Sequence, residues 1–316
     1  MKRSVYLLLS LSAMVMACGG GGRPSPEIEE EDSLCFTVGI LDDDSPEDTD
    51  EVAVMEKLIE RTPMPVAAEG LFDDFFFNFI ANKTLQRQRI TFPLTVLGIE
   101  EIDTITDSEW VHDSFFLRQG YYTLIFNSNE EMDLVRDTSV CNARVERISL
   151  TEEVVSQYIF RRDDGLWRMN CINVIPLAQD DNGEFLAFFR KFATDPTFAM
   201  LSLADIVEFE APDPDDDFSV MEGVITRDTW PAFAPDLPHE EIYNVHYLRN
   251  ATSIHSDSTA LQLSGDDGRS LPDCQPGEDL TSTMKIFVIR GISNGFETEL
   301  TFRHANGRWL LTRMTM

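Results

Sequence analysis

Two aromatic stripes stand out in the pattern of hydrophobic and polar positions along the 316-residue chain. Residues 72–79 read F-D-D-F-F-F-N-F, and the spacing F-x-x-F-F-x-x-F returns 113 residues later in F-L-A-F-F-R-K-F at 185–192. Intervals of three, four and seven residues place the rings on one face of a helix. A fully buried Phe contributes roughly 1.5–3 kcal/mol, so each stripe predicts a helix that anchors a hydrophobic core.

A second pair of matching segments lies downstream of the stripes. F-R-R-D-D-G-L-W at 160–167 corresponds to F-R-H-A-N-G-R-W at 302–309, which is 142 residues later. The D-D-G and A-N-G triplets predict hairpin turns, because Gly tolerates the positive φ of a tight turn. In both halves the helical stripe precedes alternating, strand-like segments, which predicts two copies of one α+β domain.

These patterns set the expected domain boundaries. The first domain covers residues 67–178 and the second covers 182–316, each with an antiparallel sheet packed on N-terminal helices. The offset between the two halves grows within residues 249–283, which are rich in Ser, Asp, Gly and Pro. That segment predicts an inserted loop in the second domain.

The N-terminus has the pattern of an export signal. Lys2 and Arg3 precede a short apolar run, and V-M-A-C then ends at Cys18 as a lipobox does, so residues 1–18 predict a lipoprotein signal peptide with lipid attachment at Cys18. The alternative is a secretory peptide with an incidental cysteine. Two or more acyl chains give stable attachment, so the lipid bilayer is the first expected partner.

Residues 19–66 form the expected acidic and Gly-rich tether and an ill-defined segment behind it. Within it, E-E-D at 30–32 resembles acidic signals that send some Gram-negative lipoproteins to the cell surface, or it is a solvated spacer. The prediction is an exported lipoprotein of the outer membrane, with surface exposure left open.

The formal charge of −31 narrows the expected partners. So strong a negative charge repels phosphate backbones, which argues against nucleic acid. Cationic ligands, metal ions and basic protein surfaces are electrostatically easier.

Four stretches resemble an uncharacterised family of Gram-negative bacterial lipoproteins, described only as a domain of unknown function. They are F-D-D-F-F-F-N-F-I-A-N-K-T-L-Q-R-Q-R-I-T-F-P-L, Q-G-Y-Y-T-L-I-F, A-P-D-P-D-D-D-F-S-V-M-E-G-V-I-T-R-D-T-W-P-A-F-A-P and K-I-F-V-I-R-G-I-S-N-G-F-E-T-E-L-T-F. The resemblance covers residues 71–316. It implies a fold similar to nuclear transport factor 2, a curved antiparallel sheet around helices that encloses a cone-shaped cavity, and it supplies no catalytic residues.

Cones of this type can hold an Asp or His that acts as a general base. The best candidate is His246 in Y-N-V-H-Y, which alternation places beside Asn244 and opposite Tyr243 and Tyr247. His112 is its counterpart in the first domain. A structural role for a single strand His is the competing interpretation.

An acidic cluster and an aromatic pair are further candidates. Trp230 and Phe233, in a loop bounded by prolines, would form a recognition surface if they were exposed together. The acidic cluster consists of Asp213, Asp215, Asp216 and Asp217. Its spacing begins like a Ca²⁺ loop but lacks the Gly and the bidentate Glu, so a solvated loop competes with a metal site.

The cysteines leave the redox state open. Export permits disulfides among the four that remain after lipidation, and Cys141–Cys171 is the preferred bridge because alternation points both inward. Buried thiols are the alternative. The other Trp residues could line pockets, but for Trp167 and Trp309, just past the hairpin turns, packing on the Phe helices is favoured.

Two hypotheses about function follow. The first is a membrane-anchored envelope lipoprotein that binds a small ligand or a protein partner without catalysis, through residues such as Trp230, Phe233, Asn244 and His246. The alternative is a cavity enzyme, an isomerase or hydrolyase, with His246 or a nearby carboxylate as general base. No motif for a phosphate loop, a zinc protease or a nucleophile elbow is present, and no cofactor is expected.

Overall fold

The computed structural model describes residues 57–59, 62–213, 216–248 and 282–316, apart from the side chains of residues 217 and 218. Residues 48–316 belong to one compact unit. The predictions for the signal peptide, Cys18, the tether and the loop at 249–281 lie outside the described residues. No helix in the described ranges is long and apolar enough to cross a membrane.

The first half of this unit begins with helices and continues as strands. The Phe stripe is α2 (Phe72–Ala81), and Asn82 then caps α3 (Lys83–Gln88) by accepting a hydrogen bond from the Leu85 N–H at 2.9 Å. The remaining elements are β1 (Ile90–Leu97), β2 (Ile102–Ile105), β3 (Tyr121–Phe126), β4 (Asn142–Ser149), β5 (Val154–Asp163) and β6 (Leu166–Pro176), with the short helical turns η1 (Val66–Glu69), η2 (Phe115–Arg118), α4 (Asn129–Met132) and η3 (Asp133–Arg136).

The second half also begins with helices and continues mainly as strands. After η4 (Leu177–Gln179) come α5 (Gly183–Thr194) and α6 (Pro196–Leu201), the latter capped by Asp195 as α3 is by Asn82. The remaining elements are β7 (Leu203–Asp213), β8 (Asp216–Ile225), α7 (Trp230–Phe233), β9 (Glu241–Leu248), β10 (Met284–Gly291), β11 (Glu297–Ala305) and β12 (Arg308–Thr315). Asp164-Gly165 and Asn306-Gly307 have positive φ, so both predicted hairpin turns are confirmed.

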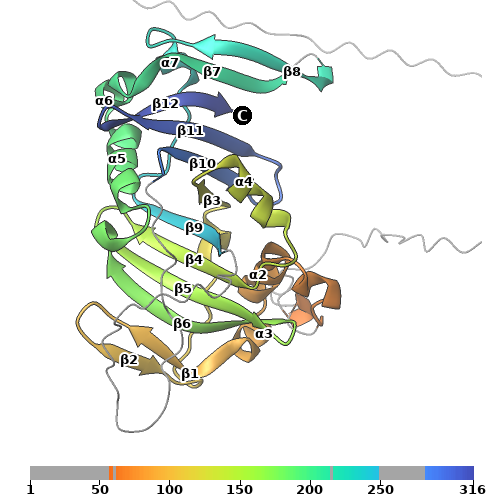
Figure 1. Cartoon of the computed structure of the whole chain (residues 1–316). Coiled ribbons are helices and arrows are strands. Elements are labelled where there is room, and N and C mark those ends of the chain that lie inside the picture. The colour runs from red at the N-terminus through yellow and green to blue at the C-terminus, as the bar shows by residue number, and fades with distance from the viewer. Residues whose placement is uncertain (1–56, 60–61, 214–215, 249–281) are drawn as a thin grey trace, which may run out of the picture. The chain divides into compact units, whose positions relative to one another are not determined.

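All twelve strands form one sheet, in the order β2-β1-β6-β5-β4-β9-β3-β10-β11-β12-β7-β8 (Figure 1). Three neighbouring pairs are parallel, namely β1–β6, β12–β7 and β3–β9, and the others are antiparallel. The predicted antiparallel sheets are thus corrected to one mixed sheet, because β6 and β12 each return beside the first strand of their own half in the same direction.

In the middle of the sheet, strands from one half of the chain pair with strands from the other half. β9 lies beside β4 along its whole length, from Asn142↔Leu248 to Ser149↔Glu241, although it comes from the second half of the chain. β3, from the first half, instead pairs with β10. The expected boundary near residues 178–182 therefore does not divide the sheet.

Two hydrophobic cores lie on opposite faces of this sheet. Along β3, Tyr122, Leu124 and Phe126 belong to the core under α2, whereas Ile125 belongs to the core under α5. Figure 1 shows these two helices on opposite sides of the strands. Adjacent side chains of one strand point to opposite faces, so the central strands serve both cores.

The aromatic stripes fill these cores. Phe72 packs on Trp167 with ring centroids 4.9 Å apart, and Phe185 packs on Trp309 at 5.4 Å. The predicted packing of both Trp residues on the Phe helices is confirmed. The stripe residues with 2% exposure or less are Phe72, Phe75, Phe76, Phe79, Phe185, Phe189 and Phe192.

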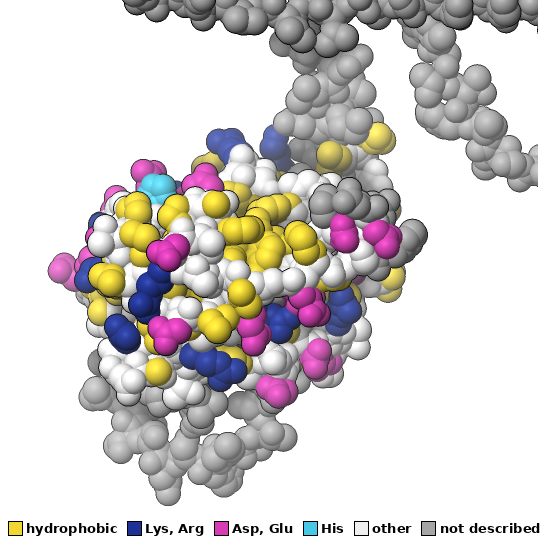
Figure 2. Space-filling model, turned by 90° about the horizontal axis from the view of Figure 1, so that it is seen from above, with side chains coloured by type: hydrophobic (Ala, Val, Ile, Leu, Met, Phe, Trp, Pro, Cys, Tyr) yellow, Lys and Arg dark blue, Asp and Glu magenta, His cyan; other side chains and the backbone are white. Residues whose placement is uncertain are grey.

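Figure 2 views the molecule from the end that carries the β7–β8 hairpin and shows hydrophobic side chains gathered on it. The large hydrophobic residues exposed on this hairpin are Ile206, Val220, Met221 and Val224. β8 is also the last strand of the sheet. An apolar surface at a sheet edge is a suitable place for contact with another protein.

Candidate functional site

The alternation of β9 divides its side chains as the sequence predicted. Tyr243, Val245 and Tyr247 lie in the core under α2, whereas Asn244 and His246 point to the other face of the sheet. There, Asn244 is opposite Glu146 and His246 is opposite Arg144 in the register of β4. The two predicted residues therefore meet a pair of oppositely charged side chains.

A salt bridge in the middle of the sheet organises this group. Arg144 Nε lies 2.8 Å from Glu146 Oε1, and the side chains of both residues are at most 1% exposed. Glu146 also accepts hydrogen bonds from Asn244 Nδ2 at 2.9 Å and from Gln157 Nε2 at 3.2 Å. These bonds offset part of the desolvation cost of a buried carboxylate.

The segment that leads into α5 completes the group. Arg144 Nη2 donates to Asp181 Oδ2 at 2.9 Å, and Gln157 Nε2 donates to Asp180 Oδ2 at 3.1 Å. Beside it, Lys285 Nζ donates to Asn182 Oδ1 at 2.6 Å. We call the following set the polar network: Arg144, Glu146, Gln157, Asp180, Asp181, Asn182, Asn244 and His246.

Burial and mutual charge give the titratable groups of the network opposite protonation preferences. Burial, reinforced by the nearby Glu146 charge, raises the pKa of Asp180 to about 8. Burial also acts on Glu146, but the Arg144 charge and the hydrogen bond from Asn244 outweigh it and hold the pKa of Glu146 below its usual value. At neutral pH the network therefore pairs a protonated Asp180 with an ionised Glu146.

His246 is neutral in this setting. Burial and the Arg144 charge lower the pKa of His246 to about 4. Its Nδ1 lies 3.1 Å from Arg144 Nη2. Because a guanidinium only donates hydrogen bonds, Nδ1 is the acceptor and the proton of the neutral ring is on Nε2. The lone pair that a general base would use is thus occupied by Arg144.

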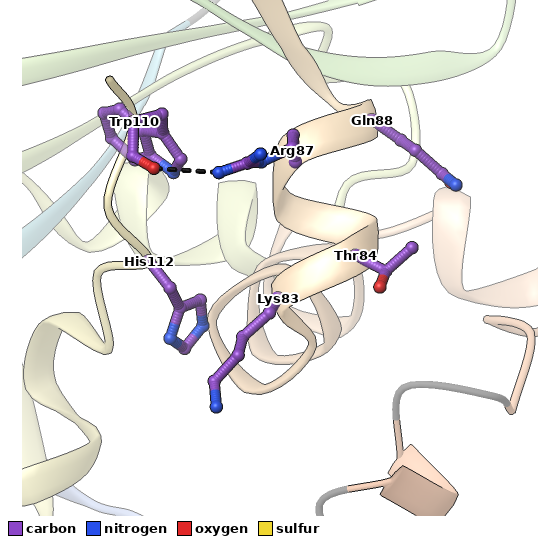
Figure 3. A pocket seen from close by; sticks show the side chains of 6 residues that line it. All are labelled: Lys83, Thr84, Arg87, Gln88, Trp110 and His112. Atoms are coloured by element: carbon purple, nitrogen blue, oxygen red, sulfur yellow. Dashed lines mark hydrogen bonds between the residues drawn. The ribbon is translucent and has the colours of Figure 1, made fainter. Parts of the chain in front are cut away.

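A second group of polar side chains lines an open pocket of about 470 Å³ on the first half (Figure 3). Lys83 and Arg87 are one helical turn apart on α3, so they face the same side. We call the following set the basic pocket: Lys83, Thr84, Arg87, Gln88, Trp110 and His112. Of these residues the sequence pattern singled out His112, and it missed the cations, whose signal is the K-x-x-x-R spacing.

The segment around Trp110 is fixed by hydrogen bonds to the helices. Trp110 Nε1 donates to Gln86 Oε1 at 3.0 Å, and the Trp110 carbonyl accepts from Arg87 Nη2 at 2.9 Å. His112 Nε2 lies 2.9 Å from the Ile80 carbonyl, to which it can only donate. These bonds hold the wall of the basic pocket in place without a ligand.

Comparisons with known proteins now place the chain. Its residues 51–266 and 273–316 match the family model described as "Domain of unknown function (DUF4348)". The chain belongs to the DUF4348 family. It is also similar to the crystal structure of an NTF2-like protein from Bacteroides fragilis NCTC 9343, with 34% sequence identity and a TM-score of 0.64, over 80% of this chain and 98% of the other. A comparison with curated proteins found no match.

The expected resemblance to a family of unknown function and to the nuclear transport factor 2 fold is thereby confirmed. This DUF4348 chain has an α+β, NTF2-like fold with one long mixed sheet.

In this DUF4348 protein Trp230 and Phe233 are not exposed together, so the condition for the predicted recognition surface is not met. Trp230 is 4% exposed and packs on Phe192 with ring centroids 5.8 Å apart. Its backbone N–H donates to the Thr226 carbonyl, which turns the segment so that the indole enters the core under α5. Phe233 alone is exposed, and it packs on Phe209.

Only part of the acidic cluster lies in the described residues. Asp213 and Asp216 face each other across the β7–β8 turn, while Asp215 and the side chain of Asp217 lie outside. Ser219 Oγ donates to Asp213 Oδ2 at 3.2 Å, as in a hydrogen-bonded turn. Within the described part of the chain, no group of three or more His, Cys, Asp or Glu could hold a metal ion.

The preferred disulfide is also corrected. Cys171 is disulfide-bonded, whereas Cys141 carries a thiol that receives a contact from Asn142 Nδ2 at 3.7 Å. Alternation placed Cys171 inward correctly, since it is fully buried, but Cys141 comes just before β4 and is half-buried.

Proposed function

We propose that this protein is a lipid-anchored lipoprotein of the cell envelope that binds a small ligand without converting it. The observation that carries the proposal is the filling of both helix–sheet interiors by aromatic rings. Phe75, Phe79 and Phe160 are fully buried in the first interior, and Phe189 stacks on Phe287 at 4.1 Å in the second. Side chains occupy the space where an NTF2-like enzyme would hold its substrate.

The state of His246 supports the same reading. A general base needs an accessible lone pair and a pKa near the working pH. His246 has neither, because Arg144 occupies Nδ1 and the pKa is lowered to about 4.

The proposal includes the duplication that the sequence indicated. In this interpretation each half is an NTF2-like unit that has exchanged its third strand with the other. Asn142–Ser149 pairs with Val154–Asp163 as Met284–Gly291 pairs with Glu297–Ala305, and Ala143↔Phe160 matches Lys285↔Phe302 at the 142-residue offset. The strands correspond one to one, with β9 in the place of β3 and the reverse.

The anchor is tested in the producing cell. Wild type and Cys18→Ala are labelled with a clickable palmitate analogue, and the cells are then fractionated. We expect label and membrane association for wild type only. Protease treatment of intact cells reports surface exposure, and equal membrane association of the two proteins would contradict the anchor.

The binding activity is tested with the full-length protein purified in detergent. It is incubated with a metabolite extract of the same cells, washed and denatured, and the released compounds are identified by mass spectrometry. We expect an unchanged compound at about one equivalent per chain, absent from a heat-denatured control. A product that accumulates beyond one equivalent would overturn the non-enzymatic proposal.

A second function has one observation in its favour. Glu146 and Asp180 are adjacent carboxyl groups whose pKa values are moved in opposite directions, as in acid–base pairs of enzymes. The enzyme would be an isomerase or hydrolyase that uses Glu146 as the base. If turnover is found in the extract experiment, Glu146→Gln should abolish it while His246→Gln should retain it.

A further inference from the structure

We propose that the basic pocket binds the anionic group of a small organic anion, a carboxylate or a phosphate or sulfate ester. The inference rests on the proposed binding function and names the site and the ligand class.

The geometry of the pocket suits such a ligand. In Figure 3, the Lys83 side chain extends beside the His112 ring, and the Arg87 guanidinium points to the Trp110 carbonyl. Thr84 and Gln88 add hydrogen-bonding groups from the same helix. Ammonium and guanidinium groups, such as those of Lys83 and Arg87 that line this pocket, are the usual partners of carboxylate and phosphate oxygens. A volume of about 470 Å³ is that of a metabolite-sized site.

The other half of the chain has a corresponding helix without these cations. At the 113-residue offset, Lys83, Arg87 and Gln88 on α3 correspond to Pro196, Met200 and Leu201 on α6. The helix has the same length and an equivalent cap in both halves, so the fold is satisfied by apolar residues at these positions.

The far wall of the pocket differs in the same way. Trp110 and Trp230 each donate a backbone hydrogen bond to a Thr four residues earlier, so these two turns are equivalent. At their 120-residue offset His112 corresponds to Ala232. Three cationic or ionisable positions of one half are thus apolar in the other, which points to a role for the first set outside folding.

The strong negative charge of the whole protein makes a cluster of cationic side chains unusual. The chain has 25 Lys and Arg residues against 56 Asp and Glu residues. Among the described residues, the Asp107 carboxylate is close to the pocket, because its Oδ1 lies 3.4 Å from Arg87 Nε. Both side chains of that pair are about half exposed, so the pair is weak and a bound anion can compete for the guanidinium.

The test is isothermal titration of the full-length protein in detergent with four probes. Benzoate, phenyl phosphate and phenyl sulfate each carry a different anionic group on the same phenyl ring, and benzyl alcohol is the neutral control. We expect at least one anion to bind more tightly than benzyl alcohol, with an affinity that falls as salt is raised. The probe that binds best identifies the anionic group.

Two double variants locate the site. Lys83→Gln/Arg87→Gln should weaken the bound anion by about tenfold for each charge removed. Arg190→Gln/Lys191→Gln, on α5 in the other half, is the matched control and should bind as wild type. Circular dichroism checks that both variants are folded.

The outcomes separate this proposal from the binding function itself. If none of the anions binds better than benzyl alcohol, or if the control variant loses as much affinity as the pocket variant, the basic pocket is not the site. The basic pocket is also not the site if the compound recovered from the extract is neutral, or if the pocket variant retains it as well as wild type does. In both cases the binding function stands. Turnover in the extract experiment would overturn the binding function instead.

Discussion

Replacement of Arg144 by Ile should be among the most destabilising single changes in the molecule. Ile is the residue that the chain itself has at the corresponding position, Ile286, so its size suits a strand of this sheet. The change leaves Glu146 fully buried without the guanidinium 2.8 Å away, and leaves Asp181 without its donor. Removal of one partner of a buried ion pair costs about 3–5 kcal/mol.

The free energy of unfolding is measured by urea titration followed through Trp fluorescence and circular dichroism. We expect a lower midpoint with an unchanged dependence on urea, since the surface exposed on unfolding is the same. Arg161→Ile is the control, because Arg161 forms an exposed salt bridge with Asp163 on the neighbouring strand β5. That variant should lose no more than about 1 kcal/mol.

The double variant Arg144→Ile/Glu146→Val separates charge from packing. Val is the counterpart of Glu146 at Val288, so the double variant copies the apolar pair of the second half. It removes the uncompensated charge and should be more stable than Arg144→Ile alone. The reasoning is refuted if Arg144→Ile costs no more than the surface control, or if the second change destabilises the protein further.

Three other predictions follow from the described geometry. A carboxyl group whose pKa is raised in the folded state stabilises the protein at low pH, and this contribution is lost as the pH rises toward the folded pKa. Asp180→Asn should therefore flatten the decline of the free energy of unfolding between about pH 4 and pH 8. At about pH 9 the variant should be more stable than wild type. Phe189→Ala removes a ring stacked on Phe287 and should lower the free energy of unfolding by about 3–5 kcal/mol. Residues 1–182 expressed alone should not unfold cooperatively, because β4 loses β9, and co-expression with residues 183–316 should restore a stable complex.

Each of these three predictions has a result that would contradict it. Urea titrations at pH 5, 7 and 9 would contradict the first if both proteins show the same pH dependence. A cost below about 1 kcal/mol for Phe189→Ala would mean that the ring is not part of a tightly packed core. A soluble 1–182 fragment with a sharp thermal transition would show that the halves do not depend on each other's strands.

The local pattern of the chain was sufficient to predict the helices and strands and part of their packing. A helical stripe of Phe places its rings on one face whatever surrounds it, and a Gly-containing turn at a fixed distance before Trp167 and Trp309 brings each Trp under its stripe. Alternation likewise separated Asn244 and His246 from Tyr243 and Tyr247. These predictions depend on backbone geometry within a few residues, which is encoded locally.

Three predictions were corrected by the structure: the antiparallel sheets, the exposure of Trp230 and the Cys141–Cys171 bridge. To make them correctly would have required information that the local pattern does not contain. Alternation identifies a strand and its two faces, but backbone hydrogen bonds are the same with any neighbour, so it could not show that β9 pairs with β4. Trp230 lies in a Pro-bounded loop by sequence, yet a single turn directs its ring into the core.

By itself, therefore, the sequence determined the helices, the hairpins, the inward faces of the strands and the family resemblance. The tertiary structure alone decided which strands are neighbours, and so which charges meet. Arg144 and His246 are about a hundred residues apart, and Lys83 and His112 line one pocket because the Trp110 segment is hydrogen-bonded to α3. Salt bridges, shifted pKa values and pockets depend on distance and burial in space, which no periodicity along the chain records.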